Sequence, residues 1–88
     1  MPASEIDKHL GARIRFARME LGFSAERLAE MIDDDPDLVK AMEAGELRVS
    51  ALRLARISRN LDKPLSWFFD GLPGQEVFDD NKPKARSV

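Results

Sequence analysis

Residues 24–44 read SAERLAEMIDDDPDLVKAMEA, a pattern typical of two short helices separated by a tight turn. The serine at the start is a favourable N-cap, and apolar side chains recur behind it at helical spacing. Asp35 and Pro36 begin a second helix, because aspartate caps a helix well and proline is tolerated at its first position. The sequence therefore predicts helices over 25–32 and 36–44.

The short connection requires the two helices to pack at a steep angle, and the residues fit that geometry. Ala29 supplies the small side chain needed where the helices cross. Asp33 stands in the turn, where a residue that tolerates positive φ is needed. Val39 and Met42 place apolar side chains on the face of the second helix that turns back toward the first. Together these features predict a helix-turn-helix.

Three further helical segments are predicted over 5–21, 51–61 and 67–70. Serines that can act as N-caps precede them, and Ser66 is the expected cap of the last one. Alternating apolar residues never extend far enough for a strand. The sequence thus predicts an all-α domain of five helices over residues 1–71. We expect residues 72–88, rich in Pro, Gly, Asp and Asn, to form a poorly ordered tail.

Composition narrows the function classes. The chain has 88 residues, no cysteine and a net charge of −2. We therefore expect one small domain without disulfides or thiolate metal sites. No apolar run reaches the roughly 18 residues needed to span a membrane, and the N-terminus lacks the features of a signal peptide. We therefore expect a cytoplasmic protein.

Several short strings occur in an order and spacing that resemble a known family. They are LGARIR at 10–15, RMELG at 18–22, ERLAE at 26–30 after Ser24, EAG at 43–45, RVS at 48–50, LARI at 54–57 and PLSWFF at 64–69. The chain resembles the phage-repressor/Cro-type helix-turn-helix proteins, also called the xenobiotic-response-element family. The resemblance covers residues 9–71. It implies a five-helix, lambda-repressor-like bundle and a DNA-binding transcriptional regulator that acts as a homodimer on a two-fold operator.

The resemblance also implies roles for individual residues. Arg18, late in the first helix, is expected to pair with Glu43, late in the third. Trp67, Phe68 and Phe69 are candidates for a homodimer contact, although they could instead cover the base of the bundle. The residues expected at the DNA are Ser24, Ala25, Asp35, Pro36, Asp37, Lys40, Ala41 and Arg48.

The chemistry of this third helix is unusual for a helix that reads bases. Pro36 and Ala41 have no side-chain donor, and an aspartate is repelled by phosphates, so Lys40 is the one credible donor there. From Glu20 to Glu46 there are nine acids against Arg27 and Lys40. The alternative is therefore a protein-interaction module on a helix-turn-helix scaffold, whose acidic face docks a basic protein or imitates DNA.

Enzymatic and metal sites have little support in the sequence. Asp33, Asp35 and Asp37 have the spacing of a calcium loop, but the glycine and the final glutamate of such a loop are missing. His9 is the single histidine, so neither a transition-metal site nor a general base is expected. We expect no enzyme, no cofactor and no metal.

Overall fold

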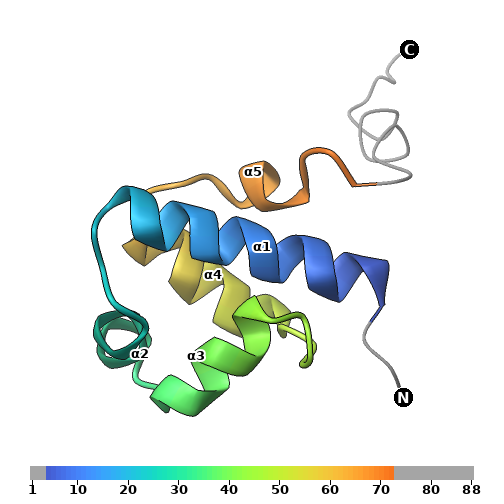
Figure 1. Cartoon of the computed structure of the whole chain (residues 1–88). Helices are drawn as coiled ribbons and strands as arrows, with labels where there is room; N and C mark the ends of the chain where they lie inside the picture. The colour runs from blue at the N-terminus through green and yellow to red at the C-terminus, as the bar shows by residue number, and fades with distance from the viewer. Residues whose placement is uncertain (1–3, 73–88) are drawn as a thin grey trace.

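The computed structural model describes residues 4–72, which form five helices and no strand (Figure 1). The helices are α1 (Glu5–Glu20), α2 (Ala25–Ile32), α3 (Pro36–Glu43), α4 (Ala51–Asn60) and α5 (Leu65–Phe69). The predicted all-α fold with a helix-turn-helix is confirmed. None of these helices is long and apolar enough to cross a membrane.

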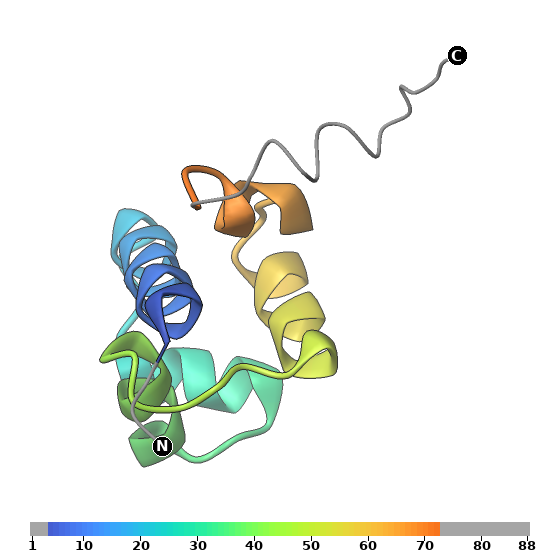
Figure 2. The same ribbon diagram turned by 90° about the vertical axis from the view of Figure 1, so that its right-hand side faces the viewer.

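Two helices connect the two ends of the domain. Figure 2 shows α1 (blue) and α4 (yellow) on opposite sides of the bundle, with α5 (orange) above them and the α2–α3 unit below. Helix α3 packs against α1 and α2, whereas α2 also packs against α4. Helix α5 packs against α1 and α4. Among the described helices, this arrangement leaves one long side of α3 without a neighbour.

One apolar core joins all five helices. Its largest fully buried side chains are Phe68, Ile14, Leu28, Ile32, Met42, Ile57, Leu61 and Val39. Ala29, expected at the helix crossing, is completely buried. Burying side chains of this size contributes roughly 1.5–3 kcal/mol each before the entropy cost of folding is subtracted. The short helices are therefore held mainly by this shared core.

Side-chain capping explains where α1 to α4 begin, but it does not explain the start of α5. The hydroxyl groups of Ser4, Ser24 and Ser50 each accept a hydrogen bond from a backbone amide three residues later. Ser66, however, lies inside α5, so its predicted role as the cap is wrong. Pro64 is the N-cap residue of α5, with φ −67° and ψ 152°, and no side chain caps this helix.

The glycine in the middle of α1 permits a very close approach to α3. A Cβ atom on Gly11 would lie 2.2 Å from the carbonyl oxygen of Met42 and 2.8 Å from that of Glu43. Only a residue without a side chain fits at these distances. The C-terminal turn of α3 therefore rests on the backbone of α1.

The expected boundary between domain and tail falls between residues 71 and 72. Leu72, the first residue of the expected tail, is only 5% exposed. The rest of the predicted tail, residues 73–88, lies outside the described residues.

Candidate nucleic-acid interface

The predicted DNA-contacting residues of the helix-turn-helix lie around its turn and along α3. Ser24 is exposed and caps α2, whereas Ala25, the first residue of α2, is 8% exposed. Asp35 caps α3 by accepting a 2.8 Å hydrogen bond from the backbone amide of Asp37. Pro36 and Ala41 are half-buried, whereas Asp37 and Lys40 are exposed. Asp33 supplies the positive φ at the turn, 59°, as its position predicted.

The one cation expected to reach bases is paired with an acid. The Nζ atom of Lys40 lies 3.3 Å from Oε2 of Glu26 on α2. A hydrogen bond with its own backbone amide, and then the nearby Lys40 ammonium, hold the pKa of the Glu26 carboxyl below its ordinary value. Both side chains are more than half exposed, so the pair can open at little cost.

The structure contains the salt bridge expected between α1 and α3. Arg18 donates from Nε to Oε2 of Glu43 at 2.6 Å and from Nη2 to Oε1 at 2.9 Å. A third bond, 2.7 Å long, runs from Nη1 to the carbonyl oxygen of Phe23. The two side chains are 13% and 8% exposed, and the bond to Glu43 raises the pKa of Arg18. This arginine therefore fixes the C-terminal end of α3 to both α1 and the segment before α2.

Sequence reasoning did not find a second salt bridge, at the other end of α3. Arg53 on α4 donates from Nε to Oδ2 of Asp34 at 2.8 Å, and its Nη2 lies 3.4 Å from Oδ1. Asp34 lies in the turn between α2 and α3. Nineteen residues separate the partners, so helical periodicity could not have paired them.

A hollow of about 290 Å³ opens beside the N-terminus of α2. It is lined by Arg15, Arg18, Ala25, Lys40, Glu43 and Ala44. Three cations and the Glu43 carboxylate thus line a hollow beside the first residue of α2, at the positive end of the helix dipole. Arg15 was not among the predicted site residues, although the sequence of α1 contains four basic residues: Lys8, Arg13, Arg15 and Arg18. Arg18 is paired with Glu43 and Lys40 with Glu26, so Arg15 is the one cation of this hollow without a salt bridge among residues 4–72.

Arg48 lies elsewhere. Its side chain is 79% exposed, and its Nε atom is 3.7 Å from Oδ1 of Asp7 near the start of α1. It also lines a separate hollow with Ile6 and Leu10. The structure therefore does not bring Arg48 into the hollow that contains Lys40.

Salt bridges offset much of the acidity that the sequence shows between Glu20 and Glu46. Five of the nine acids pair with cations: Glu20, Glu26, Glu30, Asp34 and Glu43. Three of these cations come from outside the segment: Arg18, Arg53 and Lys63. The surface of the helix-turn-helix is consequently less acidic than the linear count predicts.

The three aromatic residues of α5 have different environments. Phe68 is completely buried, so its predicted role as a dimer contact is wrong: it fills the core of its own domain. Trp67 is half-buried, with the Arg13 guanidinium 4.4 Å and the Lys63 ammonium 4.8 Å from its ring centre. Phe69 is half-buried and packs against the core. Only Trp67 and Phe69 could contribute to a surface contact.

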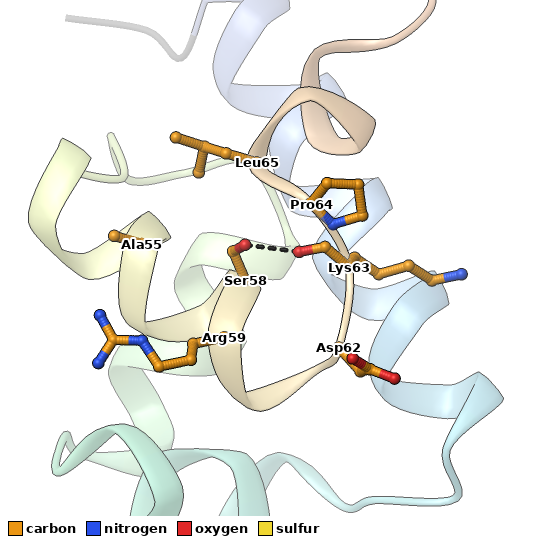
Figure 3. A pocket seen from close by; sticks show the side chains of 7 residues that line it. All are labelled: Ala55, Ser58, Arg59, Asp62, Lys63, Pro64 and Leu65. Atoms are coloured by element: carbon orange, nitrogen blue, oxygen red, sulfur yellow. Dashed lines mark hydrogen bonds between the residues drawn. The ribbon is translucent and has the colours of Figure 1, made fainter.

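A third hollow, between α4 and α5, does not have the features of a catalytic site. It measures about 480 Å³ and is lined by the residues labelled in Figure 3. The side chain of Arg59 extends away from those of Asp62 and Lys63, and the Ser58 hydroxyl is engaged by the carbonyl oxygen of Lys63 (Figure 3). Within residues 4–72, no three His, Cys, Asp or Glu side chains are grouped to hold a metal ion.

Comparison with known proteins identifies the family. A family profile described as helix-turn-helix matches residues 14–68. An uncharacterized HTH-type transcriptional regulator of Sinorhizobium medicae is 44% identical over 69 residues, which cover 78% of this chain and 50% of the relative. The chain thus spans half the length of that curated relative.

Solved structures agree with this assignment. The clp gene regulator ClgR from C. glutamicum superposes with a TM-score of 0.71 at 26% identity, over 75% of this chain and 86% of that one. The biofilm master regulator SinR, solved in complex with DNA, gives 0.65 at 27% identity, over 69% and 98%. The chain therefore belongs to the helix-turn-helix family, in its Cro/C1-type group.

Proposed function

We propose that this chain is a DNA-binding transcriptional regulator that places α3 in the major groove. The observation that carries the proposal is the cationic hollow at the N-terminus of α2, directly beside the exposed side of α3. A phosphate held there by Arg15 and the positive end of the α2 dipole sets the depth and register of the protein on the duplex. The relatives named as regulators, and SinR solved with DNA, support this function.

Base recognition in this proposal depends on few side chains. Lys40 is the donor suited to purine edges, and Asp37 can accept from cytosine N4. Ser24, Ala25, Asp35, Pro36 and Ala41 shape the surface that approaches the DNA, and Arg48 contacts a phosphate further along the backbone. Such a surface discriminates sequence modestly per half-site, which makes a two-fold operator and a homodimer the natural arrangement.

We place the homodimer contact at the edge formed by α4 and α5. Leu52 and Leu65 are 66% and 45% exposed, and Ala55, one turn after Leu52, lines the same hollow as Leu65. Burying this apolar edge adds stability that a domain of this size needs. Sedimentation velocity should show a dimer that Leu65→Glu converts to monomer, whereas a monomeric wild-type chain would overturn this part of the proposal.

Fluorescence anisotropy with mixed genomic DNA fragments, from about 50 to 200 mM salt, tests the function. We expect steeply salt-dependent binding. Arg15→Gln and Lys40→Gln should each weaken binding, and Arg15→Gln should also reduce the salt slope by about 0.9 through its lost phosphate contact. Arg59→Gln is the matched control. It also removes one positive charge, but Arg59 lies in the last turn of α4 and lines a different hollow. Absence of binding at about 50 mM salt would falsify the proposal.

One observation supports the alternative function, that of a protein-interaction module. Asp35 and Asp37 are exposed at the start of α3, the part of the helix that a partner meets first. If no DNA binds, the same face is suited to docking a basic protein surface, in the manner of a co-regulator or DNA mimic. In either role we propose a non-enzymatic protein of the cytoplasm.

A further inference from the structure

Arg53 connects α4 to the turn of the helix-turn-helix. We propose that it is a positioning residue of the DNA-binding surface: through Asp34 it sets the orientation of α3, and it does not itself bind DNA. This inference rests on the proposed function. It separates Arg53 from the exposed arginines, which are available to phosphates.

Both members of the pair are anchored through their own backbones. The amide of Arg53 donates to the capping hydroxyl of Ser50 at 3.2 Å, in the first turn of α4. The amide of Asp34 donates to the carbonyl oxygen of Ala29 on α2 at 2.8 Å. The carboxylate of Asp34 is 17% exposed and the side chain of Arg53 31% exposed. The salt bridge therefore joins two fixed points of the backbone.

The salt bridge between Asp34 and Arg53 acts on the orientation of α3 because of where Asp34 lies. Asp34 directly precedes Asp35, whose side chain caps α3. At the opposite end of α3, Glu43 is held by Arg18 of α1. Helix α3 has eight residues and only two buried side chains, Val39 and Met42. Leu38 is partly buried against the same core, and Gly11 of α1 supports only the C-terminal turn of α3. The ion pair of Asp34 with Arg53 is therefore the contact that fixes the direction of α3 at its N-terminal end.

This geometry reverses an electrostatic expectation. Asp34 and Asp37 lie three residues apart, and each would repel nearby phosphates. Repulsion alone predicts that replacing either with asparagine strengthens DNA binding. Asp37 is exposed and forms no salt bridge among residues 4–72, so Asp37→Asn should strengthen binding about two-fold. Asp34→Asn breaks the link to Arg53 and should weaken binding about three- to ten-fold.

The experiment uses the full chain and a labelled duplex selected by the wild-type chain from random-sequence DNA. Arg53→Gln should weaken binding as much as Asp34→Asn does, while the slope of log affinity against log salt stays at the wild-type value. The double variant should be no weaker than either single one, because the two changes break the same link. Arg53→Lys should restore part of the affinity. Melting curves for each variant show that the fold is retained.

Three binding results would each overturn the inference: a salt slope reduced by about 0.9 in Arg53→Gln, tighter binding by Asp34→Asn, or additive losses in the double variant. A measurement without DNA separates this inference from the proposed function. Amide hydrogen exchange in α3 should be faster in Asp34→Asn and Arg53→Gln than in Asp37→Asn. If the wild-type chain binds no DNA, the proposed function fails, and unchanged exchange in these variants would also disprove the positioning role.

Discussion

The carboxylate of Glu26 lies 3.3 Å from the ammonium of Lys40, so the cation of α3 is paired with an acid on the first turn of α2. Any phosphate or base that takes Lys40 must compete with Glu26. Because both groups are largely exposed, Glu26 competes only weakly for Lys40.

Removing that competitor should improve DNA binding. Glu26→Gln frees Lys40 and removes one negative charge beside the cationic hollow, so we expect affinity to rise about two- to three-fold. Anisotropy titrations with the selected duplex measure the change. Glu30→Gln is the matched control, since Glu30 pairs with Arg27 on the same helix. An equal gain in both variants would mean that only net charge matters.

The same pair should have a pH dependence of known sign. The pKa of Glu26 is lowered, so its contribution to stability is present above the ordinary glutamate value of 4.5 and is lost as pH falls through the lowered pKa. An NMR titration of the Glu26 side-chain carbon should show this lowered midpoint. Lys40→Ala should raise the midpoint only partly, because the hydrogen bond with the Glu26 amide is the larger cause.

Breaking the Arg18–Glu43 salt bridge from one side should be costly. Glu43→Gln leaves a guanidinium that is 13% exposed without its charged partner, and we expect a loss of about 3 kcal/mol in the free energy of unfolding. The converse change, Arg18→Met, leaves the carboxylate of Glu43 unpaired at 8% exposure and should be similarly costly. Urea denaturation measures both variants. A loss below about 0.5 kcal/mol would show that the pair is as weak as an exposed one.

A methyl group at Gly11 should harm the domain although alanine favours helices. Gly11→Ala places a Cβ against the carbonyl oxygens of Met42 and Glu43, which must move apart. We expect a loss of about 1–3 kcal/mol by thermal unfolding. In the exposed neighbouring position, Ala12→Gly should cost about 0.5–1 kcal/mol through helix propensity alone. A stabilised Gly11→Ala variant would contradict the close contact.

The turn residue Asp33 offers a stabilising change. Its φ of 59° is a conformation that glycine adopts without a steric cost. Asp33→Gly should therefore raise stability by about 0.5–1 kcal/mol, whereas Asp33→Ala should lower it. Thermal melts of the two variants, compared at equal pH, give the difference. Loss of stability in both would show that the aspartate side chain itself holds the turn.

Local chemistry made the helices predictable. The capping serines and the Asp35–Pro36 step act within a few residues, so α2 has the predicted bounds and α3 begins at the predicted residue. Exposure was less predictable: Ile6 and Met19 are large apolar residues of α1, yet they are 51% and 56% exposed. Helical spacing predicts an apolar face along a helix. How much of that face is buried depends on where the other helices lie.

The features of the site that depend on a single helix were predictable, whereas those that depend on how two helices pack were not. Lys40 was identified as the donor of α3 because neighbouring positions lack one. Its pairing with Glu26 depends on the angle between α2 and α3, and that of Arg53 with Asp34 depends on the placement of α4. A count of charges along the chain cannot show such pairs, and it therefore overstated the acidity of this surface.

Helices α1 and α4 connect α5 to the two ends of α3. Helix α1 holds one end of α3 through Arg18, and α4 holds the segment at the other end through Arg53. Both helices also contact α5. Both ends of α3 are thus connected to α5, one through α1 and the other through α4. We therefore expect a small rotation of α1 against α4 at the α5 end to tilt α3 at the opposite end.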